Sequence, residues 1–328
     1  MTHDFEGHRR LNDPVAALPC DAGKELAQSL RIATRLRAPA LFIDVALWAQ
    51  RTLGSRDFDG AAIVRTLDAI GSNLASYVSV TQLGTARAIL SAARDELAVA
   101  HLPQTPPIDE SSDYGRTARR FIDAILDDDE RKAAREVLLC IAQGTGTIDI
   151  YERVLTPVLR EAGEMWNRNE IGISQEHLVT AAVERVMAQL IDLSAATPYR
   201  EYSIVSAAPS DAQHALGARM VADNFALCGW HAAYLGANIP TDDLLDYVDR
   251  VSVDVLAISA TLARDLEPVA RLISELQDRP VAPLVLVGGR AFSLDPTLWQ
   301  QIGADGYAAT PLRAVALANE LVCSCVAD

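Results

Sequence analysis

The spacing of apolar positions separates a long helical part of the chain from a C-terminal part in which the pattern changes. Between residues 23 and 101, as in LFIDVALWAQRTL and AAIVRTLDAIGSNLASYV, apolar residues recur every three or four positions, which predicts amphipathic helices. Residues 114–196 keep this spacing in four segments, which predict an antiparallel four-helix bundle. After Pro198, short apolar runs alternate with amphipathic segments, and this alternation predicts a Rossmann-like, doubly wound parallel sheet.

These patterns predict an α + α/β fold class with a definite domain order. We expect a flexible arm over residues 1–20 and an N-terminal helical domain over residues 21–101. The segment LPQTPPIDESSD, residues 102–113, has three prolines among acids and serines and is typical of a linker. The four-helix bundle is expected over residues 114–198 and the Rossmann-like domain over residues 199–328.

Composition and charge narrow the classes of function. The formal net charge is −15 and no domain is basic, so direct binding to nucleic acid is not expected. The sequence has no apolar run long enough to span a membrane, and its N-terminus, MTHDFEGHRRLNDP, does not resemble a signal peptide. The five cysteines are scattered and odd in number. We therefore expect a cytoplasmic protein without membrane contact.

Candidate chemistry lies at the predicted carboxyl ends of the strands, where open α/β sheets bind their ligands. A nicotinamide site would need a G-x-G-x-x-G turn after the first strand, and the sequence has a histidine-containing turn there instead. The candidate residues are Asp211, His214 and Gly217 after the first strand, Ser259 and Thr261 after the third, and Gly288 and Gly289 after the fourth.

The series H-x-x-G, S-x-T and GG on this strand order resembles the cobalamin-binding domain of methionine synthase and its relatives. The resemblance implies that His214 replaces the cofactor's own benzimidazole as the lower cobalt ligand. It also implies that Ser259 and Thr261 bind the displaced nucleotide tail, while Gly288 and Gly289 leave room for it. Neutral imidazole is a suitable ligand for cobalt. The family usually has an acid two residues before the histidine; this chain has Ala212 there, with Asp211 one position away.

The end of the predicted bundle carries a second resemblance. Trp166 is followed by nine residues and then by Glu176 and His177. This W-x9-E-H pattern resembles the helical cap of MerR-type, adenosylcobalamin-dependent photoreceptors, and it implies that these three side chains line the space above the corrin. In that family a histidine follows the tryptophan, and this chain has Asn167 instead. Because an amide is a poor cobalt ligand, either His177 takes this role or no state with two histidine ligands forms.

The two resemblances imply a light sensor rather than an enzyme. Photolysis of the adenosyl–cobalt bond would rearrange the helical cap and signal to a protein partner or within a homo-oligomer. Two alternatives remain open: a corrinoid protein that carries methyl groups between methyltransferases, and a haem or redox sensor on the same fold. The ligand on the upper face would distinguish the first alternative, and the cofactor spectrum would distinguish the second.

The N-terminal helical domain allows two interpretations. Some cobalamin photoreceptors of similar architecture, the photocobilins, pair the corrinoid with a bilin, so residues 21–101 could help to form a site for biliverdin. Cys20 on the arm could attach such a bilin. Alternatively, the block is a plain dimerisation or signalling bundle.

Overall fold

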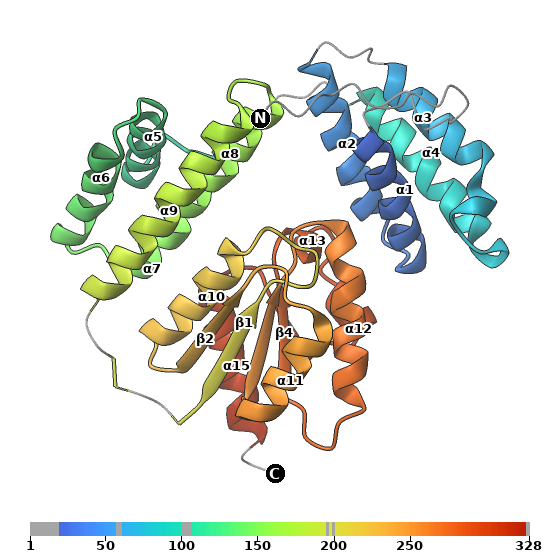
Figure 1. Cartoon of the computed structure of the whole chain (residues 1–328). Helices are drawn as coiled ribbons and strands as arrows, with labels where there is room; N and C mark the ends of the chain where they lie inside the picture. The colour runs from blue at the N-terminus through green and yellow to red at the C-terminus, as the bar shows by residue number, and fades with distance from the viewer. Residues whose placement is uncertain (1–19, 57–60, 100–105, 195–196, 199–200, 326–328) are drawn as a thin grey trace. The chain divides into compact units, whose positions relative to one another are not determined.

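A computed structural model describes residues 20–56, 61–99, 106–194, 197–198 and 201–325 (Figure 1). The chain divides into two compact units, Met1–Leu102 and Pro103–Asp328. The predicted arm lies outside the described residues except for Cys20, where the first helix begins, and the side chain of Cys20 also lies outside them. None of the described helices is long and apolar enough to cross a lipid bilayer.

The first unit is helical, as its apolar spacing predicts. Its elements are α1 (Cys20–Arg35), α2 (Pro39–Gly54), α3 (Ala61–Ser72), the 3-10 turns η1 (Leu74–Ser76) and η2 (Val80–Gln82), and α4 (Leu83–Val99). Helix α2 begins with a proline, which is favoured there because the first helical N–H has no partner within the helix. Leu26, Leu30, Leu41 and Phe42 are fully buried and form part of this unit's core.

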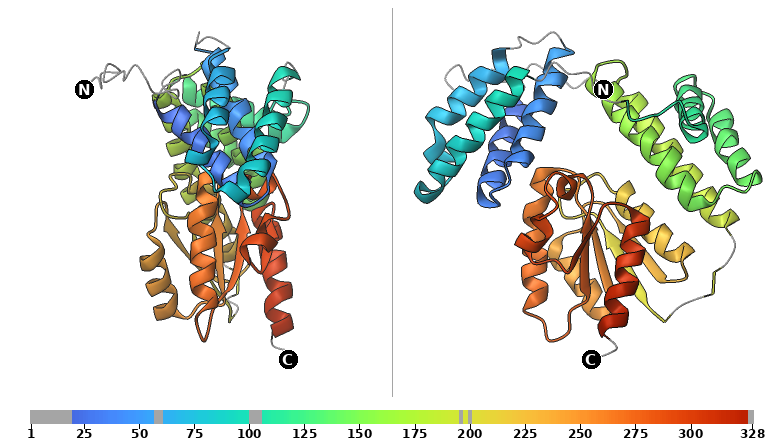
Figure 2. Two further views of the ribbon diagram at one scale, coloured as in Figure 1. Left: turned by 90° about the vertical axis from the view of Figure 1, so that its right-hand side faces the viewer. Right: turned by 180° about the vertical axis from the view of Figure 1, so that it is seen from behind.

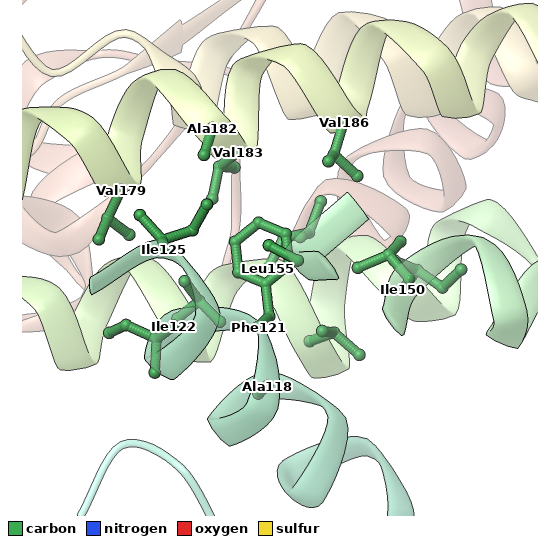
Figure 3. Packing of buried hydrophobic residues seen from close by; sticks show 14 of the residues in the cluster. Ala118, Phe121, Ile122, Ile125, Ile150, Leu155, Val179, Ala182, Val183 and Val186 are labelled. Atoms are coloured by element: carbon green, nitrogen blue, oxygen red, sulfur yellow. The ribbon is translucent and has the colours of Figure 1, made fainter. Parts of the chain in front are cut away.

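The second unit begins with the bundle. Its elements are α5 (Asp113–Leu126), α6 (Glu130–Ala142), α7 (Thr147–Ile150), the π-helical turn η3 (Tyr151–Leu155), α8 (Thr156–Asn167) and α9 (Ile173–Leu193). The side chain of Ser112 caps α5 by accepting a hydrogen bond from the amide of Gly115 at 3.0 Å. Phe121, Leu155 and Val183 come from three of these segments and point into one apolar core (Figure 3).

The third segment of the bundle differs from the single α-helix that its pattern predicts. It consists of α7 and α8 with the π-helical turn Tyr151–Leu155 between them. We attribute this turn to Pro157, which lacks an amide hydrogen and whose ring would collide with the carbonyl of Arg153 in a regular helix. The hydroxyl of Thr156 donates to the carbonyl of Tyr151 at 2.9 Å and satisfies one of the displaced backbone acceptors.

The rest of the second unit is a five-stranded parallel sheet, which confirms the predicted α + α/β class. Its strands are β1 (Ser203–Ala207), β2 (His231–Gly236), β3 (Val255–Ser259), β4 (Leu284–Gly288) and β5 (Gly306–Ala308), in the spatial order β2-β1-β3-β4-β5. The connecting helices are α10 (Leu216–Leu227), α11 (Thr241–Val251), η4 (Ala263–Asp265), α12 (Leu266–Gln277), α13 (Arg290–Ser293), α14 (Leu298–Ile302) and α15 (Pro311–Cys325).

Helices cover both faces of this sheet. Helices α11 and α12 lie on one face, and α10 and α15 lie on the other (Figures 1 and 2). Every residue of β3 is buried, as expected of a central strand between two helical layers. The strand order reverses direction between β1 and β3, and such a switch point opens a crevice at the carboxyl ends of the two strands.

Candidate functional site

The loop that follows β1, next to the switch point, carries the predicted histidine. His214 lies in the loop between β1 and α10, two residues before the helix begins. Its side chain is exposed, and within the described ranges no hydrogen bond to its imidazole is found. Both ring nitrogens are therefore open to a ligand from solvent or to a metal.

The loop that carries His214 is held in place by a residue that follows the neighbouring strand β2. The amide of Asp211 donates to the side-chain oxygen of Asn238 at 2.8 Å, and Asn238 lies just beyond the end of β2. Both residues have left-handed backbone conformations, with φ of 64° at Asp211 and 53° at Asn238. Asparagine and aspartate tolerate this region better than other residues with side chains. Asp211 therefore contributes its backbone to the shape of the loop, while its carboxylate remains exposed.

The candidate residues at the ends of β3 and β4 lie in one row at the carboxyl edge of the sheet. Ser259, at the end of β3, pairs with Gly288 of β4, and Gly288 pairs with Ala308 of β5. A Cβ atom at Gly217, in the first turn of α10, would come within 2.7 Å of the Ser259 hydroxyl oxygen, and one at Gly288 within 2.8 Å of the Ala308 carbonyl oxygen. At both glycines the neighbouring segment packs too closely to leave space for a side chain.

Gly289 occupies a backbone conformation that only glycine adopts readily. Its φ is 92° and its ψ is 174°. A Cβ atom there would also overlap the carbonyl oxygen of Ala260. The carbonyl of Ala260 accepts a hydrogen bond from the amide of Ala291, so the turn after β4 packs directly against the turn after β3.

The turn that carries Thr261 is fixed by a buried acid. The carboxylate of Asp265 accepts hydrogen bonds from the amides of Thr261 and Leu262, at 2.9 and 2.8 Å. Asp265 is 2% exposed, and these two bonds offset the cost of burying its charge. Ser259 is 8% exposed, and Thr261 is half-buried. Their hydroxyls therefore sit on a rigid turn beside the glycine row.

The candidate cap residues gather at one end of the bundle. Trp166 and Asn167 end α8, Glu176 and His177 lie in the first turns of α9, and the two helices pack side by side (Figure 1). Trp166 is half-buried, whereas Asn167 is only 2% exposed. The carboxylate of Glu176 lies 2.6 Å from Nδ1 of His177. An ionised carboxylate at this distance would accept a hydrogen bond from Nδ1, which would leave Nε2 of the exposed imidazole for a ligand.

Two supporting residues are not evident from the sequence. Asn238 follows β2, an edge strand whose carboxyl end carries none of the candidate groups, yet this end holds the histidine loop. Asp265 has a weak sequence signal, since it follows Thr261 and Leu262 by four and three residues, a spacing at which an acid often caps the amides of a turn.

Replacing Asn238 tests whether this loop contact matters for binding. We expect Asn238→Ala to weaken binding of the cobalamin that the resemblance implies about fivefold, because one hydrogen bond contributes roughly 1 kcal/mol. Titration followed by absorbance measures the change. Asn238→Asp keeps an acceptor oxygen and a residue that tolerates positive φ, and we expect it to bind like the parent. Equal weakening in both variants would show that the hydrogen bond is not the cause.

Two regions of the chain match known protein families. Residues 202–316 match the family model of a B12 binding domain, and residues 117–191 match a second family model with the same description. The chain is a cobalamin-binding protein. The cobalamin-binding sheet domain covers the strands that carry the candidate residues, and the second match covers most of the bundle.

Curated relatives of this cobalamin-binding protein fall into two groups. The HTH-type transcriptional repressors CarH and CarA of Myxococcus xanthus are 28% identical over 43% of this chain and 29% identical over 58% of it. The chain spans about half the length of CarH and 64% of CarA. Trimethylamine corrinoid protein 1 of Methanosarcina mazei is 21% identical over 56% of this chain and 87% of its own length.

A solved structure confirms the fold. The monomethylamine corrinoid protein of Methanosarcina barkeri superposes with a TM-score of 0.53 at 17% identity and covers 63% of this chain and 98% of its own. This likeness concerns the fold, whereas the two matches to B12 binding domains support a corrinoid as the cofactor.

Proposed function

We propose that this protein is a light sensor that binds adenosylcobalamin between the carboxyl edge of its sheet and the cap end of its bundle. The observation that carries this proposal is the clustering of Trp166, Glu176 and His177 at one end of the bundle, in a chain that is similar to CarH and CarA. Bound adenosylcobalamin supplies a cobalt–carbon bond that visible light can break.

His214 is the proposed lower ligand. Its imidazole is exposed, makes no hydrogen bond among the described residues and lies on a loop held by Asn238. Such an imidazole can supply the lower cobalt ligand that is missing once the benzimidazole of the cofactor is displaced. The displaced nucleotide tail is proposed to run beside Gly217 and Gly288, where no side chain projects, and the hydroxyls of Ser259 and Thr261 border this path. No carboxylate contacts His214 within the described residues, so its imidazole would ligate without the acidic partner that usually raises ligand basicity.

The cap residues have the exposure that an upper face requires. Ile173 is 59% exposed at the start of α9, and Trp166 is half-buried one loop before it. Both are apolar side chains at the cap end, where they would help to exclude water from above the corrin. The side chain of His177 is 74% exposed, whereas Asn167 is enclosed in the bundle. His177 is therefore the imidazole available to interact with an altered upper face.

Replacing Trp166 tests the cap assignment. We expect Trp166→Ala to lower the preference for adenosylcobalamin over methylcobalamin roughly 10-fold or more, because a buried aromatic contact is often worth about 2 kcal/mol. Competitive titration with the two cobalamins measures the ratio of dissociation constants. Trp166→Phe retains most of the ring and should keep most of the preference. An unchanged ratio in Trp166→Ala would count against the cap.

Illumination tests the proposed function itself. The protein is loaded with adenosylcobalamin in the dark, and its absorbance spectrum and elution volume are recorded before and after green light. We expect a spectral change that marks loss of the cobalt–carbon bond together with a change in molecular size. Photolysis at the rate of free adenosylcobalamin, with no change in size, would contradict a sensor.

Methyl transfer is the second candidate function. It is supported by the corrinoid proteins of methanogens, which align with this chain over most of their own length. A methyl carrier would bind methylcobalamin at least as tightly as adenosylcobalamin, and its cap would open to a partner methyltransferase. The same competitive titration therefore separates the two candidates.

The remaining parts of the proposed function are the target of the signal and the role of the first unit. We propose that the signal passes to a protein partner or a second copy rather than directly to DNA, because no domain of the chain is basic. Residues 21–101 would either bind a bilin such as biliverdin or serve as a dimerisation bundle. A far-red absorbance band on addition of biliverdin would support the first role.

A further inference from the structure

Within the described residues, one turn of the bundle makes several contacts with the sheet domain. The hydroxyl of Tyr151 donates to Asp223 of α10 at 2.9 Å. Thr156 contacts the sulfur of Met220, also on α10, at 3.6 Å, and the amide of Leu312 at the start of α15 donates to Glu152 at 3.4 Å. These three bundle residues belong to the π-helical turn or directly follow it. Such turns are frequent at functional sites.

We call these contacts between the π-helical turn and helices α10 and α15 the joint. Tyr151 is a hydrogen-bond donor in it. It is fully buried in the core of the bundle, and its hydroxyl also lies 3.2 Å from the carbonyl of Met187 on α9. Burial, and then the nearby Asp223, hold the pKa of Tyr151 above its ordinary value, so the phenol remains protonated and donates. The carboxylate of Asp223 also lies 3.8 Å from Arg219.

One face of α10 connects this joint with the proposed ligand loop. Leu216, Met220 and Asp223 follow the i, i+4, i+7 spacing of a single helix face. Met220 belongs to the core of the bundle, and Leu216 packs against it. Leu216 is the first residue of α10 and lies only two positions after His214. A displacement of the bundle on this face would therefore act directly on the end of the loop.

A second contact braces the same loop end. The hydroxyl of Tyr234, on β2, donates to the carbonyl of Ala215 at 3.4 Å. Burial raises the pKa of Tyr234, and the carboxylates of Glu184 on α9 and Asp223 on α10 add to the shift. Charges from the bundle and from α10 thus both act on the side chain that contacts the residue after His214.

We propose that Tyr151 is a positioning residue which, through Asp223, fixes the bundle on α10 and so holds the His214 loop in its ligating position. This inference rests on the proposed lower-ligand role of His214. The coupling is reciprocal, since any ligand that favours one arrangement of the bundle must favour the matching arrangement of the loop. A change on the upper face of the cofactor would thereby reach the lower ligand through the protein.

Hydrogen exchange in the dark tests this coupling without any light response. The full-length protein is loaded with adenosylcobalamin, and amide exchange over residues 209–217 is compared between the parent and Tyr151→Phe. This variant keeps the buried ring, so we expect it to fold. We expect exchange of the loop to become roughly 5- to 30-fold faster, because a hydrogen bond to a charged group is lost at the joint. The spectrum should also show a smaller fraction of histidine-ligated cobalt.

Two controls separate coupling from general loosening. Tyr202→Phe removes a hydroxyl from a ring that packs on Trp230 and should leave the loop unchanged. If the two joint residues act as one contact, Tyr151→Phe should add no further effect in an Asp223→Ala background.

The contradicting result is equally specific. Faster exchange confined to residues 147–156, with an unchanged loop and an unchanged cobalt spectrum, would overturn the proposal. If the protein responds to light but the variant shows this pattern, the coupling is ruled out and the sensor function is retained. If the variant shows the coupling but the protein does not respond to light, the sensor function is ruled out and the coupling is retained.

Discussion

We expect His214→Ala to weaken cobalamin binding by at least roughly 10- to 100-fold. Metal affinity falls by this much when a residue that only hydrogen-bonds to a metal ligand is removed. The variant removes the proposed lower ligand itself and leaves the cofactor's own benzimidazole as the competing base. What still binds should therefore show the spectrum of benzimidazole-ligated cobalamin. Titration of the dark protein with adenosylcobalamin, followed by absorbance, measures both effects.

A second histidine provides the matched control. His231 lies at the opposite, amino end of the sheet, at the start of β2. We expect His231→Ala to bind cobalamin like the parent with an unchanged spectrum. If His214→Ala and His231→Ala bind alike, the lower-ligand assignment is wrong.

The second large effect concerns stability. We expect Gly289→Ala to lower the free energy of unfolding by about 3 kcal/mol or more, because two penalties add. The conformation at φ 92° and ψ 174° is strained for any residue with a Cβ, and the added methyl group would overlap the Ala260 carbonyl. Urea denaturation of the cobalamin-free protein, followed by circular dichroism, measures the loss. Binding should also weaken, because the turn after β4 borders the proposed tail site.

A glycine in open space gives the opposite expectation. Gly163 lies within α8, and a Cβ atom added there would meet no neighbouring side chain or segment within 4 Å. Gly163→Ala should stabilise the protein by roughly 0.5–1 kcal/mol, since alanine loses less backbone freedom on folding. If Gly289→Ala were as stable as the parent, the backbone at the carboxyl edge would differ from the one described.

The predicted fold follows from features that one sequence displays directly. Short apolar runs and helical spacings alternate after Pro198, and this alternation is sufficient to predict a parallel sheet with helices on both faces. The ends of β1, β3 and β4 could then be searched for candidate residues, which is how His214 and Gly289 are found. Their identification depends on local sequence, because Gly289 directly follows β4 and His214 lies in the loop that follows β1.

Features that depend on contacts between distant segments are not predictable in this way. Asn238 holds a loop 27 positions earlier in the chain, and Tyr151 contacts Asp223 72 positions later. No periodicity marks either pair. The π-helical turn is hidden for a related reason, because Pro157 predicts some disturbance of the helix without specifying which carbonyls are displaced or which hydroxyl satisfies them.

The most direct test of the account is to identify the atom bound to the lower face of cobalt. The protein is produced with nitrogen-15 in its histidines only, loaded with cobalamin of natural isotope content, reduced to the paramagnetic cobalt(II) form and examined by electron paramagnetic resonance. If His214 is the ligand, the nitrogen splitting changes from the nitrogen-14 pattern to the nitrogen-15 pattern, and His214→Ala abolishes that change. A nitrogen-14 pattern in the labelled parent protein would mean that benzimidazole remains bound, which would contradict the central claim.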